Sequence, residues 1–241
     1  MGGSEGGSLA VLTGAGISAE SGIATFRGMG GLWNDVPIEE VATPRGFAKD
    51  PKRVWEFYEA RRRQAGSCRP NAGHAGLARL EEILGPERFT LITQNVDGLH
   101  FLAGSKNVLE VHGSLWQVRC TGCGVEREDR TVPFEALPPR CDCGSMLRPA
   151  VVWFGEYLPE GVFERAVAAA EACALFLVVG TSAQVEPAAS LARIASRAGA
   201  EVWEVNPEET PLSAISDRSW RSGAGEVMGE VVLAARSLLG C

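Results

Sequence analysis

Short apolar runs along the chain predict a set of buried strands. Residues 9–12 and 173–179 are apolar throughout, and residues 89–93 are apolar except for two threonines. All three runs have the length of strands that are covered on both faces. Residues 107–111 and 201–205 predict two further strands. Stretches with helical periodicity separate several of these runs. Such alternation predicts an α/β fold with a parallel sheet and right-handed crossovers.

Capping residues mark where two of the helices begin. Asp50, followed by proline, predicts the start of a helix over residues 51–64. Asn71 predicts the start of a second helix, which ends at Gly85-Pro86. Periodicity predicts two more helices, at residues 188–198 and 226–239.

A glycine-containing turn follows the first predicted strand. The spacing Gly14-x-Gly16-x-x-Ala19 is that of a dinucleotide-binding turn, in which two glycines let the backbone approach a pyrophosphate. A helix that opens at Ile17 would direct its free N–H groups toward the phosphates. A plain turn of small residues fits the same letters. Likewise, the glycine-rich residues 28–33 fit either a lid over the turn or a surface loop.

Polar residues also follow the other strands. Residues 94–100 read QNVDGLH, His112 follows the strand at 107–111, and residues 180–182 follow the strand at 173–179. In a doubly wound sheet, ligands bind at the carboxyl ends of the strands. Clustered polar side chains are costly to bury unless a ligand or a protein group pairs with them. The alternative is a turn capped by Asn and Asp.

Composition and charge exclude several classes of protein. The chain has 241 residues, of which 45% are hydrophobic and 22% charged, as in globular proteins. Its net charge of −7 argues against a nucleic-acid partner. No apolar run is long enough for a membrane span, and the glycine-rich start lacks the apolar segment of a secretion signal. We therefore expect a cytoplasmic protein that does not bind membranes.

Four of the seven cysteines lie close together in the sequence. Cys120 and Cys123 form one pair, and Cys141 and Cys143 form the other. Four thiolates can complete a closed tetrahedral zinc site, which stabilises a module too small for its own core. The second pair is one residue shorter than the usual Cys-x-x-Cys. A redox-active dithiol is the alternative, because Cys-x-x-Cys also serves that chemistry.

These elements divide the chain into a larger and a smaller domain. The predicted Rossmann-like domain comprises residues 1–34, 86–115 and 150–241. The smaller domain combines a helical module at residues 35–85 with a zinc-binding module at residues 116–149.

The order of the motifs resembles that of the sirtuins, the NAD-dependent protein deacylases. The resemblance rests on GAGISAESGIATFRG, TQNVDGLH, VHGS, the four cysteines, VVWFGE, GTSAQVEP and VNP, and it spans residues 9–239. It implies a Rossmann-like doubly wound sheet, NAD as co-substrate, one structural zinc ion and acyl-lysine proteins as partners. We expect the chain to be a monomer.

The resemblance also implies roles for individual residues. His112 is implied as the catalytic histidine, with Asn95 and Asp97 beside it. We assign no catalytic role to His74 or His100. The residues implied to bind the cofactor are Gly14, Ala15, Gly16, Ile17, Glu20, Ser21, Phe26, Arg27, Trp33, Gln94, Asn95, Val96, Asp97, Gly180, Thr181, Ser182, Asn206 and Ala224. The residues implied to pair with the substrate backbone as an added strand are Val152, Trp153, Phe154 and Gly155.

The chemistry of the family fits these residue types. Breaking the nicotinamide–ribose bond requires a dry pocket and a nearby negative charge or amide dipole, which Asp97 and Asn95 can supply. A histidine suits the removal of a ribose hydroxyl proton because its pKa lies near neutrality. The products would be nicotinamide, O-acyl-ADP-ribose and free lysine. Alternatives are a satisfied core histidine at position 112, a mono-ADP-ribosyltransferase with the same pocket, and a non-catalytic NAD- or peptide-binding module.

Two residues on the helix at 51–64 indicate which acyl group is removed. Tyr58 and Arg61 share a helix face, and Tyr-x-x-Arg resembles the motif of the desuccinylase branch of the sirtuins. A guanidinium and a phenol can hold the distal carboxylate of a succinyl or malonyl group, which an acetyl group lacks. We therefore expect desuccinylation with some deacetylation. The alternative places Arg61 in a solvated run, residues 61–63.

Overall fold

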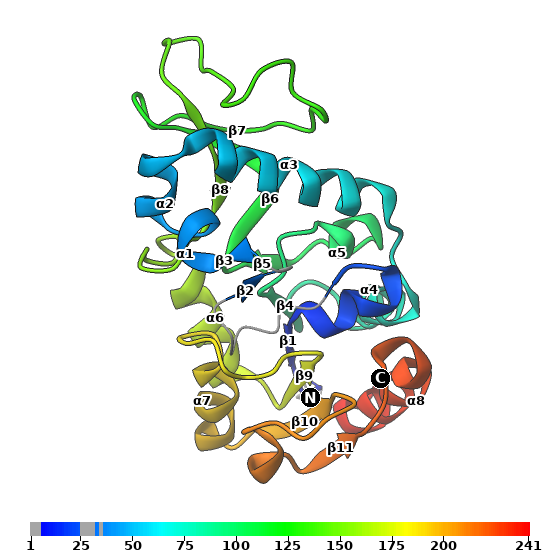
Figure 1. Ribbon diagram of the computed structural model, residues 1–241. Helices are drawn as coiled ribbons and strands as arrows, with labels where there is room; N and C mark the ends of the chain where they lie inside the picture. Colours follow the sequence, from blue (N-terminus) through cyan, green and yellow to red (C-terminus); the bar gives the residue numbers. More distant parts are fainter. Residues whose placement is uncertain (1–5, 25–31, 34–35) are drawn as a thin grey trace.

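The computed structural model describes residues 6–24, 32–33 and 36–241, with only the backbone described at 32–33. Its larger part is a parallel sheet, which has six strands within the described residues (Figure 1). Their spatial order is β11 (Arg218–Trp220), β10 (Glu201–Val205), β9 (Leu175–Val179), β1 (Leu9–Thr13), β4 (Phe89–Thr93) and β5 (Val108–Glu110). The chain extends the sheet from β1 through β4 and β5, then returns to the other side of β1 through β9. The strand order therefore reverses at β1, which places a ligand site at its carboxyl end.

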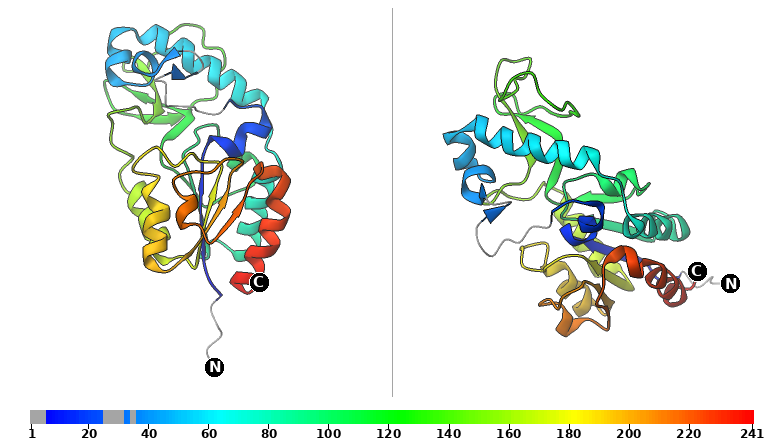
Figure 2. Two further views of the ribbon diagram at one scale, coloured as in Figure 1. Left: turned by 60° about the horizontal axis from the view of Figure 1, so that its bottom comes forward. Right: turned by 45° about the vertical axis from the view of Figure 1, so that its right-hand side comes forward.

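Helices cover both faces of this sheet (Figure 2). One face packs against α4 (Ala72–Leu84) and α8 (Ala224–Leu239), and the other packs against α6 (Val162–Ala172) and α7 (Ser190–Ala198). Successive β1 side chains alternate between the two cores: Leu9 and Val11 enter one, and Ala10 and Leu12 enter the other. Burial on both faces explains why the strands read as continuous apolar runs.

The smaller part lies above the carboxyl ends of the strands (Figure 1). It contains α1 (Ile38–Val41), α2 (Pro44–Lys49), α3 (Pro51–Ser67) and an antiparallel sheet with the order β7 (Glu126–Glu128), β6 (Gly113–Cys120) and β8 (Leu147–Val151). Trp55, Tyr58 and Trp153 lie in its core. The remaining short elements are η1 (Ala15–Ser21), β2 (Leu32–Trp33), β3 (Val36–Pro37), α5 (Leu99–Leu102) and η3 (Ser213–Ile215).

The predicted strands and the two capped helices are confirmed. The Asp50 carboxylate accepts the Arg53 N–H at the start of α3, and the Asn71 side chain accepts the Gly73 N–H at the start of α4. The turn after β1 differs from the prediction, because it continues as the 3₁₀ helix η1. A 3₁₀ helix is tighter than an α-helix and occurs in short segments of this kind.

The packing of α4 bears on the proposed domain boundary. Leu77, Leu80 and Leu84 of α4 lie in the core that covers the parallel sheet, not in the core of the smaller part. The domain division stays a proposal. These contacts favour a boundary between α3 and α4, near residue 68, over the one predicted at residue 85.

Among the described helices, none combines the length and apolarity that a membrane span requires.

Candidate active site

A cavity of about 960 Å³ lies between the two parts of the molecule. The sheet contributes residues that follow β1, β4, β9 and β10, among them Gly14, Gln94, Gly180 and Asn206. The smaller part contributes residues of α3 and the segment after β8. The volume lies at the upper end of the range for small-molecule and cofactor sites.

The turn after β1 presents backbone to this cavity. Gly14, Ala15 and Gly16 all line it. A Cβ on Gly14 would lie 2.8 Å from the Gly180 carbonyl oxygen, and one on Gly16 would lie 2.7 Å from the Gly180 Cα. The Gly16 N–H donates to the Gly180 carbonyl at 2.7 Å. The two glycines are therefore required by the close approach of the turns after β1 and β9, and together these turns form a backbone cradle that suits a pyrophosphate.

Hydrogen bonds join the segments that follow β4, β9 and β10, across the end of β1. Gln94 Nε2 donates to Thr181 Oγ1 at 2.9 Å, and Asn206 Nδ2 donates to the Thr181 carbonyl at 3.0 Å. Residues that follow β4, β9 and β10 are thus held in one rigid rim. Val96, Ser182 and Ala224 also line the cavity, as predicted for a cofactor site.

Asn95 and Asp97 form a buried polar cluster with Ser18. Asn95 Nδ2 donates to the Gly14 carbonyl at 3.1 Å and lies 3.2 Å from Ser18 Oγ. The two Asp97 carboxylate oxygens accept from the Leu99 N–H and from the Ser18 hydroxyl, each at 2.8 Å. Burial raises the pKa of Asp97, and these two hydrogen bonds act in the opposite direction. The cluster fixes both side chains at the cavity wall, which they line together.

His112 lies at the cavity wall with one ring nitrogen engaged. Its Nδ1 lies 3.1 Å from the Gln94 carbonyl oxygen. A carbonyl can only accept, so Nδ1 carries the hydrogen and Nε2 is the unprotonated nitrogen. Burial lowers the pKa of His112, which keeps the ring neutral at neutral pH. A neutral imidazole with a free Nε2 lone pair is the form that a general base requires.

The other two histidines lie side by side behind this site. The rings of His74 and His100 are 4.9 Å apart, and both residues are fully buried. His100 Nε2 lies 2.9 Å from Thr13 Oγ1, and His74 Nε2 lies 3.4 Å from Ser18 Oγ. Sequence reasoning assigned neither histidine to the site, and it missed Ser18. The sequence placed Ser18 within GAGIS and His100 within NVDGLH, whereas His74 belongs to neither motif.

Removing His100 is expected to change how stability depends on pH. Burial lowers the pKa of His100 to about 3, so the folded state leaves it neutral while the unfolded chain protonates it below pH 6.5. Its contribution to stability is therefore lost as pH falls, by about 1.4 kcal/mol per pH unit. His100→Gln should flatten the fall in the free energy of unfolding between pH 6.5 and 4, measured by urea denaturation.

Glu110 offers a control of opposite sign. Burial raises the pKa of Glu110 to about 7, so as pH falls its carboxylate is protonated in the folded state before it is protonated in the unfolded chain. That proton uptake favours folding. Glu110→Gln should make the loss of stability between pH 7 and 4.5 steeper. Parallel pH profiles for wild type and His100→Gln would contradict the assignment of His100.

Tyr58, Arg61 and Trp153 form the cavity wall on the side of the smaller part. All three line the cavity, and all three are buried. Trp153 Nε1 donates to the Tyr58 hydroxyl at 2.9 Å. Burial raises the pKa of Tyr58 and lowers the pKa of Arg61 to about 10, so both side chains stay protonated at neutral pH. Arg61 therefore belongs to the buried face of α3, while Arg63 of the same run is exposed.

The segment predicted to pair with a substrate backbone borders the cavity along residues 152–155. Part of its backbone is already engaged. The Val152 N–H donates to the His112 carbonyl and the Phe154 N–H to the Ala42 carbonyl, each at 2.9 Å. The Trp153 N–H donates to the Glu156 carboxylate. The Trp153 carbonyl accepts the Glu156 N–H at 3.0 Å, so a substrate strand would have to pair with the carbonyl of Val152 or Phe154, or with Gly155.

Some predicted cofactor residues lie apart from the cavity lining. Ile17 is fully buried in the core below the turn, and Ser21 Oγ accepts from Asn71 Nδ2. Glu20 lines the cavity, but its carboxylate accepts the Gly225 N–H at the start of α8. Phe26 and Arg27 lie outside the described residues, as does the side chain of Trp33.

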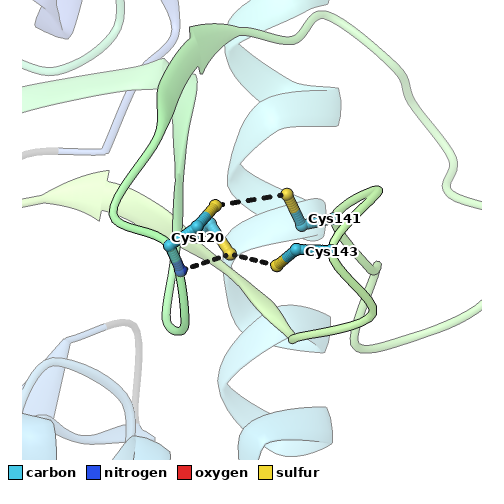
Figure 3. A group of neighbouring side chains, drawn as sticks. Cys120, Cys141 and Cys143 are labelled. Atoms are coloured by element: carbon cyan, nitrogen blue, oxygen red, sulfur yellow. Dashed lines mark hydrogen bonds between the residues drawn. The ribbon is translucent and has the colours of Figure 1, made fainter.

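The four clustered cysteines converge in the smaller part, and Figure 3 labels three of them, Cys120, Cys141 and Cys143. Their Sγ atoms all lie within 4.8 Å of one another. The Cys120–Cys143 and Cys123–Cys141 sulfur pairs are 3.4 and 3.8 Å apart. Tetrahedral zinc with bonds of about 2.3 Å requires sulfur–sulfur distances near 3.8 Å. The N–H groups of Gly122 and Cys123 point to the Cys120 sulfur, as in a turn that stabilises thiolates. The donor set and its geometry therefore fit one structural zinc ion, despite the shortened second pair.

Both the sequence and the fold are similar to those of known proteins. The Sir2 family model matches residues 14–187. An Aquifex aeolicus protein named NAD-dependent protein deacylase is 51% identical over 224 residues, which are 92% of this chain and 93% of that protein. An Archaeoglobus fulgidus protein named NAD-dependent protein deacylase 1 is 52% identical over 232 residues, which are 96% of this chain and 94% of that protein.

Solved structures show the same similarity. A Sir2 homologue in complex with NAD has a TM-score of 0.89 at 50% identity, covering 98% of this chain and 91% of that chain. A Sir2 protein with a deacetylated p53 peptide and 3′-O-acetyl ADP-ribose has a TM-score of 0.84 at 33% identity, covering 95% of this chain and 94% of that chain.

Proposed function

Because the chain belongs to the Sir2 family, we propose that it removes acyl groups from lysine side chains of proteins in an NAD-dependent reaction. The observation that carries this proposal is the position of His112. It lies at the wall of a large cavity that the Gly14–Gly16 turn also borders, and it is held in the tautomer of a general base. The proposed products are nicotinamide, O-acyl-ADP-ribose and free lysine.

The residues of this chain fit NAD along the rim of the sheet. The Gly14–Gly16 turn would hold the pyrophosphate, and Asn206 and Ala224 would lie toward the adenosine end. When bound, NAD supplies a ribose carbon whose bond to nicotinamide can break. Asn95 and Asp97 would orient this end, and the buried Asp97 carboxylate would stabilise the positive charge that develops on the ribose as its bond to nicotinamide breaks. His112 would accept a ribose hydroxyl proton at Nε2.

The acyl specificity that we propose is for succinyl or malonyl groups. Arg61 and Tyr58 lie on one buried face of α3, and both border the cavity. A charged guanidinium in a largely desolvated wall favours a carboxylate at the end of the acyl chain. An acetyl group would leave these polar groups without that partner. Deacetylation is therefore expected to be the weaker activity.

Arg61→Met tests this specificity. The substitution removes the charge and retains an unbranched apolar chain. It is expected to lower kcat/KM for succinyl-lysine peptides by about tenfold or more, because charge-assisted hydrogen bonds contribute about 1.5–3 kcal/mol. The value for acetyl-lysine peptides should change by less than about twofold, since an acetyl group makes no such contact. The measurement is nicotinamide release with a panel of acylated peptides.

The same panel separates the alternative activities. Mass spectrometry of the products distinguishes deacylation from mono-ADP-ribosylation, because only the latter attaches ADP-ribose to the protein and needs no acyl-lysine. An unchanged succinyl-to-acetyl ratio in Arg61→Met would refute the acyl preference and leave the deacylase activity standing. We also propose that the protein is cytoplasmic, in which case its cysteines should be found as free thiols. We further propose that it is a monomer, which size-exclusion chromatography would test.

A further inference from the structure

The side chain of Trp153 contacts the proposed acyl site through Tyr58. Its indole Nε1 donates to the Tyr58 hydroxyl at 2.9 Å, and the two rings lie 6.5 Å apart at an angle of 43°. Trp153 is 2% exposed, and Tyr58 is fully buried. The proposed substrate contacts of the 152–155 segment are made by its backbone, so they leave the role of this side chain open.

The position of Trp153 is fixed by an ion pair. The Arg148 guanidinium lies over the indole, 3.5 Å from the ring centroid. It also pairs with Glu156 through two hydrogen bonds, from Nη1 to Oε1 at 2.5 Å and from Nη2 to Oε2 at 2.9 Å. Glu156 Oε2 accepts the Trp153 backbone N–H as well. The Phe47 ring packs nearby, at 5.3 Å. The indole N–H therefore points at Tyr58 from a rigid frame.

This hydrogen bond controls where the Tyr58 hydroxyl hydrogen can point. A phenol donates one hydrogen bond and can accept others. The indole can only donate, so Tyr58 is the acceptor in this pair, and its own hydrogen must point elsewhere. Within the part of the chain that the structure describes, no hydrogen bond from the Tyr58 hydroxyl to an acceptor is recorded, while Tyr58 itself borders the cavity.

We propose that Trp153 is a positioning residue for acyl selection, whose indole N–H directs the Tyr58 hydroxyl hydrogen toward the carboxylate of a succinyl or malonyl group. The inference rests on the acyl preference proposed above. A carboxylate satisfies this buried donor, whereas an acetyl methyl group leaves it without an acceptor. An unsatisfied buried hydrogen-bonding group costs free energy, and so the frame works against acetyl as well as for succinyl.

Trp153→Phe removes the indole N–H and keeps an aromatic ring under Arg148. We expect it to lower kcat/KM for succinyl-lysine peptides by about three- to tenfold, mainly through KM, because one neutral hydrogen bond is lost from the acyl site. The value for acetyl-lysine peptides should not fall in parallel, so the succinyl-to-acetyl ratio should drop. In a Tyr58→Phe background the same substitution should leave the succinyl-to-acetyl ratio unchanged, because the hydroxyl that it orients is absent.

Trp55→Phe is the matched control. Trp55 lies in the same core, and its Nε1 donates to the Leu147 carbonyl at 2.8 Å, away from Tyr58. It should lower thermal stability and leave the succinyl-to-acetyl ratio at the wild-type value. If Trp153→Phe lowered kcat/KM equally for both peptides, the inference would be wrong. It would also be wrong if Trp153→Phe still lowered the succinyl-to-acetyl ratio when Tyr58 is phenylalanine. Either result would leave the acyl preference standing. A wild-type protein with no preference for succinyl-lysine would overturn the acyl preference and this inference together.

Discussion

Replacing His112 with alanine is expected to lower steady-state nicotinamide release by about 10²–10⁴-fold, the usual contribution of a general base. The imidazole donates from Nδ1 to the Gln94 carbonyl and keeps a lone pair on Nε2 at the cavity wall. No other histidine reaches this position, because His74 and His100 are fully buried behind Ser18 and Thr13. The loss should appear with succinyl- and acetyl-lysine peptides alike, since both reactions need the same proton transfer.

The pH profile adds an independent test of the same residue. Burial lowers the pKa of His112, so the base stays deprotonated below pH 6.5 and kcat/KM should hold there before it falls. His112→Ala should remove that acidic limb. Its melting temperature and its NAD binding, measured by calorimetry, should remain close to wild type, because the ring makes a single hydrogen bond within the residues that the structure describes, to the Gln94 carbonyl. Wild-type turnover in a folded His112→Ala variant would remove the base assignment.

Local signals in the sequence were enough to predict five of the six strands that the described residues contribute to the parallel sheet, but not β11. The runs that became β1, β4 and β9 are buried on both faces, and such strands are apolar at nearly every position. The caps Asp50 and Asn71 act within a few residues of themselves, so they can be read from the sequence. The helix α6 was missed because its buried positions, Ala166 and Ala170, are alanines and give little periodic contrast.

Contacts between distant segments could not be predicted in the same way. The sequence pattern attributed Gly14 and Gly16 to ligand binding. The structure shows that a Cβ at either position would clash with Gly180, which is more than 160 residues away in the sequence. The pairing of Trp153 with Tyr58 spans 95 residues. The motif Tyr58-x-x-Arg61 indicated the chemistry of the wall, while the side chain that orients its hydroxyl was visible only in three dimensions.

The packing of α4 shows the same limit at the level of whole elements. Its apolar face could be read from the sequence, but not which core that face joins. Leu77 and Leu80 lie against the parallel sheet, although the chain places α4 directly after α3 of the smaller part. Amphipathic periodicity defines a buried stripe and leaves its partner open.

Removing the metal is expected to disrupt the smaller part and the active site together. Metal-loaded protein treated with a chelator should release one zinc ion per chain, and structural sites of this kind contribute about 10–16 kcal/mol in isolated peptides. β6 begins next to His112 and ends at Cys120, and β8 begins close to Cys143 and leads to Trp153. Both strands therefore connect the cysteine cluster to the cavity wall. Loss of the metal should make residues 121–146 sensitive to protease and lower deacylation severalfold or more.

Cys143→Ser tests the effect of losing a metal ligand, and Cys241→Ser is the control for losing a thiol elsewhere in the chain. Cys143 lies in the cluster, and Cys241 is an exposed cysteine at the end of the chain. Cys143→Ser should lower the zinc content, measured by atomic absorption, and reproduce the protease sensitivity. Cys241→Ser should match wild type in both measurements. If chelated protein kept its protease resistance and its activity, the four thiols would not be a structural zinc site, and a redox-active pair would become the better interpretation.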